Sequence, residues 1–363
     1  MVTFLPRLPG RLADVTSFDR AIGGAESNVA CTLARTGHPT RWISRVGTDG
    51  FGDHLLAAIA ACGVDVRHVR RDPLRPTGVY FRTAGDRATG SHEVAYYRAG
   101  SAASAMTADG LDRAALHAGR ILHLSGITAA LSADCLGLLT ELTARRPGRP
   151  LLSFDVNYRP GLWRDTARAG VLLDLARGAD LVFVGDDEAR DAWGLDGPRA
   201  IRRALPEPHT LVVKQGAAGA TVFRRTRGAD GRRDDATGTV DGRRDDATGT
   251  AGGHRDDATG TATFVPALDV DVVAATGAGD AFAAGFLSAT LRGLPDRARL
   301  RHGHLWAAAA LTVPGDLATP PSRPYADRLA ALDDPAWERL HLAPGWTDAD
   351  TSGHRAGEEV PTK

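Results

Sequence analysis

The segment Ala275-Thr276-Gly277-Ala278-Gly279-Asp280, followed by AFAAGFLSATLRG, is the most informative stretch of this chain. The apolar run after it predicts a helix that ends at Gly293, and the small residues 277–279 let backbone N–H groups turn toward one point. Such donors at a helix N-terminus form an anion hole that suits a phosphate group in transfer. Asp280 would lie at its mouth, where a carboxylate can accept a proton from a hydroxyl. The alternative is that Asp280 is only an N-cap in a tight turn.

The helix dipole is expected to keep Asp280 ionised, so its strength as a base would come from its position more than from a raised pKa.

Apolar runs of strand length alternate with amphipathic stretches of helical length on both sides of this segment, which is typical of a mostly parallel α/β sheet. The predicted strands are 121–125, 151–155, 181–184 and 211–214. The predicted helices include 26–36, 133–145 and 165–177. Residues 77–82 and 93–98 are aromatic and β-branched, and the polar stretch between them predicts a hairpin that covers a site as a flap.

The bulk composition narrows the class of protein. The 363 residues carry 44 basic and 44 acidic side chains, which removes the main electrostatic argument for nucleic acid or an anionic membrane as partner. Only Lys214 and Lys363 are lysines. Three scattered cysteines give neither a disulfide framework nor a zinc spacing. No apolar run approaches the ~20 residues of a membrane span, and the N-terminus lacks a signal-peptide core, so we expect a cytoplasmic protein.

Two segments are expected to lie outside the folded core. Residues 231–263 contain three copies of an 11-residue unit related to GRRDDATGTVD, which has almost no apolar residues to bury. We therefore predict a disordered insertion over about 228–262, between two strands of a hairpin near 221–224 and 263–266. The polar tail from about Gly345 is also predicted to be disordered.

Three motifs in one order extend this interpretation: GGAESNVA at 23–30, RVGTDGFG at 45–52, and TGAGDAF at 276–282. Together they resemble the phosphofructokinase-B/ribokinase family of small-molecule kinases over residues 1–325, apart from the insertion, and leave 326–363 as a C-terminal extension. The resemblance implies a doubly wound, mostly parallel sheet flanked by helices, with a small β lid at about 75–100. It implies ATP and Mg²⁺ as cofactors, a homodimer formed through the lids, and catalysis by Asp280 with Gly277, Ala278 and Gly279.

Within that family, three further segments look like those of 2-keto-3-deoxygluconate kinases: PTGVYF at 76–81, YYRAGSA at 96–102 and DVNYRP at 155–160. A sugar acid carries a carboxylate, which two arginines from separate segments can bind bidentately. The residues expected to bind this substrate are Gly24, Asn28, Tyr80, Tyr97, Arg98 and Arg159. Cross-strand packing is the alternative for the tyrosines, and a surface salt bridge for the arginines.

The nucleotide is expected at VVKQGAAG, residues 212–219, which resembles the family's K-x-G-x-x-G turn. The expected contacts are Lys214, Gly216, Gly219, Gly277 and Gly279, with Asn157 and Arg159 near the phosphates. Asp187 or Glu188 would hold Mg²⁺ through water, and the alternative for GDDEA at 185–189 is an N-capped helix.

Three departures from the family pattern qualify the resemblance. The segment Val2-Thr3-Phe4 follows no Gly-Glu strand, so part of the first central strand is expected to be missing and the sheet to lose a pairing partner. Ala274 stands where an Asp usually helps to hold a monovalent cation, and Gly185 replaces the usual Asn of the magnesium motif. The sequence therefore predicts phosphorylation of a sugar acid, with a fructokinase- or ribokinase-type enzyme for neutral sugars, or a catalytically weak sugar-binding homologue, as alternatives.

Overall fold

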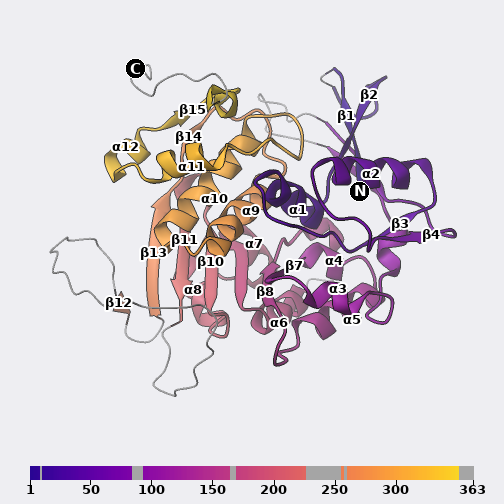
Figure 1. Cartoon of the computed structure of the whole chain (residues 1–363), viewed down its shortest axis with the longest axis horizontal. Helices are drawn as coiled ribbons and strands as arrows, with labels where there is room; N and C mark the ends of the chain where they lie inside the picture. The colour runs from indigo at the N-terminus through magenta and orange to yellow at the C-terminus, as the bar shows by residue number, and fades with distance from the viewer. Residues whose placement is uncertain (9, 84–92, 164–168, 226–254, 257–259, 351–363) are drawn as a thin grey trace.

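A seven-stranded sheet forms the centre of the protein in a computed structural model, which describes residues 1–8, 10–83, 93–163, 169–225, 255–256 and 260–350 (Figure 1). The strand order is β12-β13-β11-β10-β9-β8-β7. The pairs from β7 to β10 are parallel and the remaining pairs are antiparallel. The strands are β7 (Ile121–Ser125), β8 (Leu151–Asp155), β9 (Leu181–Gly185), β10 (Thr210–Lys214), β11 (Gly219–Arg224), β12 (Arg255–Asp256) and β13 (Gly260–Pro266).

Helices cover both faces of this sheet, as a doubly wound fold requires. Alternate residues of one strand feed two separate cores, since Leu181 and Phe183 pack on one side while Val182 and Val184 pack on the other. One face carries α1 (Ala25–Arg35), α9 (Ala278–Leu291), α10 (Asp296–Leu311), α11 (Arg323–Ala330) and α12 (Asp334–Glu338). The other carries α4 (Gly126–Ala129), α5 (Ala133–Thr143), α6 (Gly170–Gly178), α7 (Asp186–Trp193) and α8 (Pro198–Ala204).

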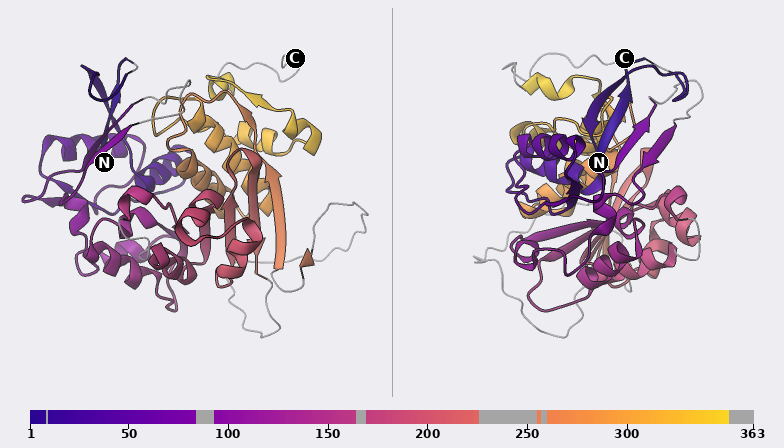
Figure 2. Two further views of the ribbon diagram at one scale, coloured as in Figure 1. Left: turned by 180° about the vertical axis from the view of Figure 1, so that it is seen from behind. Right: turned by 90° about the vertical axis from the view of Figure 1, so that its right-hand side faces the viewer.

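A separate four-stranded sheet of order β2-β1-β5-β6 stands out from the body at the end where the N-terminus lies (Figures 1 and 2). The predicted hairpin is present as β5 (Val79–Arg82) and β6 (Val94–Tyr97), which pair antiparallel. The lid is larger than expected, because β1 (Val2–Pro6) pairs with β5 and with β2 (Phe18–Ile22). No strand of the described residues lies on the outer side of β7, so β7 is an edge strand of the central sheet.

Shorter elements complete the fold. They are β3 (Arg45–Gly47), β4 (Arg70–Asp72), α2 (Gly50–Ala61), α3 (Arg113–His117) and the 3₁₀ turns at Ala102–Ala105, Pro160–Leu162 and Gly216–Ala218. Among the described residues, no helix combines the length and the apolar character needed to cross a bilayer.

The C-terminal segment corrects two predictions. The proposed boundary at residue 325 crosses the core, because Trp337 and Trp346 are buried with residues of α9 and α10. Disorder from about Gly345 is wrong for Trp346–Asp350, which form a 3₁₀ turn anchored by the Trp346 ring. This segment also contributes β15 (His341–Leu342), which pairs with β14 (Asp269–Val270). Residues 351–363 lie outside the described part.

The repeat region is described only at its edges. The two strands predicted to flank it pair antiparallel as β11 and β13, with Thr221 opposite Phe264. The expected insertion extends too far, because β13 begins at Gly260 and Arg255–Asp256 pairs with it. Residues 226–254 and 257–259 lie outside the described part.

Candidate active site

A cavity of about 2080 Å³ opens between the lid, α1, the N-terminus of α9 and the carboxyl ends of the parallel strands. Asp155, Gly185 and Lys214 close β8, β9 and β10 and all line this cavity. In open α/β sheets, ligands bind outside these strand ends. The volume exceeds the range of about 300–1,000 Å³ for a single small-molecule site, and the cavity extends along the edge strand β7. It has room for two ligands side by side.

The predicted anion hole lies at one wall of the cavity. Gly277 is the N-cap of α9 with φ of 81°, a left-handed conformation that glycine adopts without strain. Since α9 begins at Ala278, the N–H groups of Ala278, Gly279 and Asp280 precede the first intrahelical bonds and are available to an anion. Asp280 is therefore the third residue of the helix and not its N-cap, which excludes the alternative interpretation.

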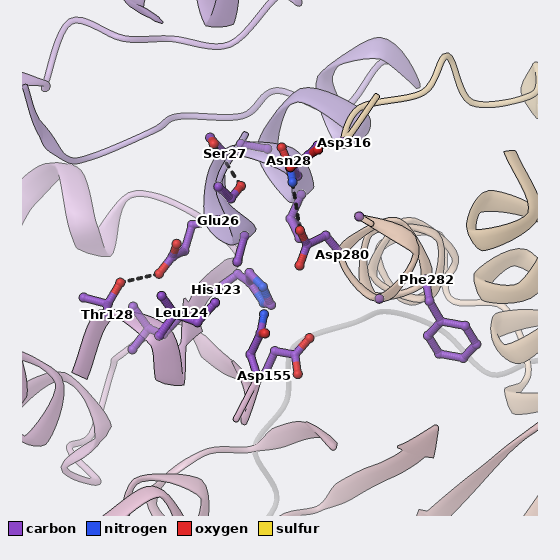
Figure 3. A pocket seen from close by; sticks show the side chains of 18 of the residues that line it. Glu26, Ser27, Asn28, His123, Leu124, Thr128, Asp155, Asp280, Phe282 and Asp316 are labelled. Carbon is purple, nitrogen blue, oxygen red and sulfur yellow. Dashed lines mark hydrogen bonds between the residues drawn. The ribbon is translucent and has the colours of Figure 1, made fainter. Parts of the chain in front are cut away.

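Asp280 faces the cavity and is held by α1 (Figure 3). The Asn28 side-chain amide donates to Asp280 Oδ2 at 2.8 Å. Burial raises the pKa of Asp280 from 3.8 to about 7, although the hydrogen bond from Asn28 lowers it. The expectation that the helix dipole keeps the pKa of Asp280 low is therefore wrong, because desolvation of the carboxylate outweighs the dipole. A carboxyl group with this pKa is well matched to act as a base near neutral pH.

Asn28 makes a contact that the sequence did not predict, and its binding of a substrate hydroxyl stays a prediction. Its amide is used by Asp280, so it orients the base, and its Oδ1 is buried without a hydrogen-bond partner in the described structure. Gly24 agrees better with its prediction, because it lines the cavity with φ of 139° and presents its backbone there.

A buried ion pair lies beneath the anion hole. Lys214 Nζ is 3.1 Å from both carboxylate oxygens of Asp155. Burial alone would lower the pKa of Lys214, but the carboxylates of Asp155 and Glu188 raise it, so the ammonium stays charged. A Cβ placed on Gly279 would be 3.6 Å from Lys214 Nζ. The ammonium is thus close enough to the anion hole to meet a phosphate bound there.

Strand alternation decides which lid side chains face the cavity. Tyr80, Tyr96 and Arg98 line it, whereas Tyr97 lies on the opposite face against the Phe81 ring, with 66% of its surface exposed. The prediction for Tyr97 is corrected to Tyr96, which is directly opposite Tyr80 in the hairpin. The Arg98 guanidinium lies 4.6 Å from the centre of the Tyr96 ring and is 9% exposed, so it is a cation held at the cavity wall.

Arg159 and Glu188 lie together at the strand ends. Arg159 Nη1 donates to Glu188 Oε1 at 2.8 Å, and Glu188 Oε2 accepts from the Gly185 N–H at 2.9 Å. Asn157, two residues before Arg159, has φ of 44°, a backbone strain of the kind found at functional sites, and it lines the cavity.

The fit of Mg²⁺ rests on Glu188, the carboxylate predicted to bind it. Both its oxygens already accept hydrogen bonds, and the described residues contain no cluster of three or more acidic, His or Cys ligands. Mg²⁺ in phosphoryl-transfer sites commonly takes one or two carboxylates with water and substrate phosphates. Glu188 fits this pattern through an intervening water.

The turn predicted to hold the nucleotide lines the cavity at Gly216 and Gly219. Gly216 has φ of 55°, and a Cβ there would meet no atom within 4 Å. A Cβ on Gly219 would lie 2.3 Å from the Val265 carbonyl oxygen, so this glycine is required first by strand packing. Beside the turn, Leu268, Val270 and Leu311 form an apolar wall.

Several cavity residues were not identified from the sequence. Glu26 accepts from Thr128 Oγ1 at 2.5 Å (Figure 3). His123 Nδ1 lies 2.9 Å from Ser153 Oγ. Asp155 and Tyr96 lie in the motifs DVNYRP and YYRAGSA, so these motifs could have identified them. Glu26 also lay in a quoted motif, whereas His123 had no local pattern around it.

The geometry of this site agrees with the family of proteins that the chain resembles. A family model described as pfkB family carbohydrate kinase matches residues 2–240 and 247–323. The chain belongs to the pfkB family of carbohydrate kinases. It is therefore a sugar kinase with the ribokinase-like α/β fold, as the motifs predicted.

Among characterised relatives, a 2-dehydro-3-deoxygluconokinase of Bacillus subtilis is 32% identical over 89% of this chain and 90% of its own length. The enzyme of the same name from Thermoproteus tenax is 31% identical over 88% and 89%. A probable chloroplastic fructokinase of Arabidopsis thaliana is 30% identical over 86% and 75%. A solved PfkB protein from Polaromonas superposes with a TM-score of 0.71 at 32% identity, covering 90% and 96%. These relatives establish a sugar kinase and leave its substrate open.

Proposed function

We propose that this kinase transfers the γ-phosphate of ATP to the terminal hydroxyl of a sugar acid, 2-keto-3-deoxygluconate (2-dehydro-3-deoxygluconate) or a close analogue. The observation that carries the proposal is Arg98, a guanidinium 9% exposed at the lid wall of the cavity. The Glu26 carboxylate acts on Arg98 through space, and a sugar carboxylate would supply a direct partner for this buried cation. The two relatives named as 2-dehydro-3-deoxygluconokinases support the same substrate.

We propose an orientation of the sugar between the lid and the anion hole. Arg98 takes the carboxylate while Tyr80 and Tyr96 form the wall beside it, and Arg159 reaches the substrate from the strand ends. The opposite end of the sugar then points to Asp280. With a pKa of about 7, Asp280 accepts the hydroxyl proton as the oxygen attacks phosphorus. Asn28 keeps the carboxylate in that orientation.

The phosphates are stabilised from the other side. The N–H groups at residues 278–280 and the Lys214 ammonium face the developing charge, and phosphoryl transfer depends mainly on such positioning and electrostatic stabilisation. The apolar wall at Leu268, Val270 and Leu311 suits the adenine ring. Mg²⁺, when bound near Glu188, would neutralise charge on the phosphate oxygens. Two solved structures of the same fold, a sugar kinase of Pyrococcus horikoshii and a putative ribokinase of E. coli, are complexes with ATP and with ATP and Mg²⁺.

A substrate comparison tests the acid. ADP release from the purified full chain is measured with 2-keto-3-deoxygluconate and with fructose, for the native protein and for Arg98→Ala. Loss of a charge-assisted hydrogen bond costs about 2–3 kcal/mol, so kcat/KM for the acid should fall roughly 30- to 150-fold. The same variant with fructose is the internal control and should change little. Equal losses on both substrates, or a native preference for fructose, would contradict the proposal.

A neutral-sugar kinase is the second candidate, favoured by the fructokinases among the relatives. The panel above distinguishes it, because a fructokinase gives its highest kcat/KM with fructose. A catalytically weak binding protein would show thermal stabilisation by the sugar without ADP release.

A homodimer through the lid is also proposed. On the outer lid face the rings of Phe4, Phe18 and Tyr97 each contact the Phe81 ring, a surface suited to burial against a second lid. Sedimentation of the native chain and of Tyr97→Asp tests the dimer. A native chain that sediments as a monomer would refute it. The cytoplasmic location stays a prediction from the sequence.

A further inference from the structure

A buried carboxylate joins the lid to the body at one point. Asp316, in the loop between α10 and α11, accepts a hydrogen bond from the Tyr80 hydroxyl and one from Arg82 Nε at 3.1 Å. Arg82 Nη2 lies 2.9 Å from the same carboxylate and donates to the Pro314 carbonyl at 2.6 Å. Tyr80 and Arg82 are two residues apart on β5, so both point to the same face. Two side chains of β5 therefore bind this loop from one side.

The main chain of the same loop touches the anion hole. A Cβ on Gly277 would lie 2.2 Å from the Asp316 carbonyl oxygen, so the loop packs directly against the N-cap of α9. Gly23, next to α1, is enclosed by the same group, because a Cβ there would lie 2.1 Å from the Tyr80 hydroxyl oxygen and 2.7 Å from Asp316 Oδ2. Any displacement of Asp316 thus moves atoms that contact both the lid and Gly277.

We propose that Asp316 is a positioning residue of the phosphate pocket, which locks lid strand β5 to the anion hole at Gly277. The backbone donors of the hole then take their working geometry only while Tyr80 and Arg82 hold the Asp316 loop. Asp316 does not need to touch either substrate for this role. The inference rests on the kinase activity of the family and not on which sugar is accepted.

The opposite charges of Arg82 and Asp316 predict the direction in which each substitution changes phosphate binding. The Arg82 and Asp316 side chains are only 4% and 5% exposed, so each neutralises the other in a setting with little solvent screening. Arg82→Met would leave a buried carboxylate beside a pocket that must accept phosphates, and this carboxylate would repel them. Asp316→Asn in the same chain removes that charge again.

The experiment compares Asp316→Asn, Arg82→Met and the double variant with a control pair of partly buried charges. Arg224 and Asp296 form that control, with Arg224 Nε 3.0 Å from both oxygens of Asp296. Asp296 begins the 16-residue helix α10, which is about 24 Å long and whose other end leads to the loop of Asp316. The measurements are Tm, kcat on the best sugar of the native enzyme, and affinities for ATP and for adenosine.

Asp316→Asn should lower kcat about 10- to 100-fold, the scale of a displaced catalytic group, while adenosine affinity is kept. Arg82→Met should weaken ATP more than adenosine, and the double variant should regain ATP affinity relative to Arg82→Met. Asp296→Asn should lower Tm without changing kcat. The proposal is overturned if Asp316→Asn lowers only Tm, or if Arg82→Met weakens ATP and adenosine equally. Should Arg82→Met not fold, Tyr80→Phe replaces it, and unchanged kcat in both Tyr80→Phe and Asp316→Asn refutes the coupling.

Discussion

Removal of the Asn28 amide should move the acid limb of the pH–rate profile to higher pH. Asp280 must be ionised to accept a proton, and its pKa of about 7 places the limb near neutrality. Below that pH the group is protonated, so kcat/KM of the native enzyme should fall about tenfold for each pH unit. The hydrogen bond from Asn28 stabilises the ionised form and lowers the pKa of Asp280. Without it the pKa rises.

The size of the shift follows from the energy of that bond. A hydrogen bond to a charged group contributes roughly 1.5–3 kcal/mol, and 1.36 kcal/mol corresponds to one pKa unit, so Asn28→Ala should shift the limb upward by about 1–2 pH units. At pH 7 this lowers kcat/KM by roughly 5- to 50-fold, and much of the loss should return at pH 9.

The assay is ADP release at constant ionic strength from pH 5 to pH 9, with low sugar so that kcat/KM is read. Titration of the nucleotide is common to every variant, so only the difference between profiles is interpreted. Ser27→Ala is the matched control, because the Ser27 hydroxyl on the same helix donates to the Gly24 carbonyl and not to Asp280. Coincident limbs for Asn28→Ala and the native enzyme would show that this amide does not tune the base.

Other substitutions probe separate parts of the molecule. Asp280→Asn should abolish ADP release and yet stabilise the free protein above pH 7. The folded pKa of about 7 against the ordinary 3.8 means that the native protein loses stability as pH rises between these values, by at most ~4 kcal/mol. Thermal unfolding of both proteins at pH 4 and pH 8 checks the sign of this effect. Tyr96→Ala should raise the sugar KM about tenfold, whereas Tyr97→Ala should leave it unchanged. A raised KM for Tyr97→Ala alone would mean that Tyr97 binds the sugar, as the sequence predicted. Lys214→Arg should lose about 100-fold in kcat, because a planar guanidinium does not fit where a compact ammonium meets the phosphate; full activity would exclude a specific role for the ammonium. Trp346→Ala should cost roughly 3–5 kcal/mol in denaturant unfolding, and a change near zero would mean that the C-terminal turn is not anchored in the core.

The parallel part of the sheet was the most predictable feature of the fold. Strands at 121–125 and 151–155 have the bounds that the sequence indicated, since buried parallel strands are short continuous apolar runs bounded by polar residues. Phe18–Ile22 could not be found in this way, because its sequence FDRAI alternates neither cleanly nor in a buried run. Its strand exists through pairing with β1, a partner that local pattern does not identify.

The C-terminal segment shows a different limit. Composition marked residues after about 345 as disordered, and composition averages over a window in which only one residue is large and apolar. That residue, Trp346, packs near the ring of Tyr325 at 5.9 Å between centres and fixes the turn. A single aromatic anchor can outweigh a polar neighbourhood when a hydrophobic core is already present to receive it.

The residues around the lid show which contacts the sequence can predict and which it cannot. Arg98 and Tyr96 are two residues apart on or next to one strand, so alternation alone puts them on the same face and puts Tyr97 on the other. Once Arg98 was assigned to the substrate carboxylate, Tyr96 followed from the strand period, and the assignment of Tyr97 broke that rule. Asp316 is the opposite case. Its partner Tyr80 is 236 residues away and the residue lies in a loop without a motif, so only the folded chain brings the lid, the carboxylate and Gly277 together. If Asp316 couples them as proposed, the residue that positions the phosphate donors is one that no reading of the glycine-rich segment itself could have named.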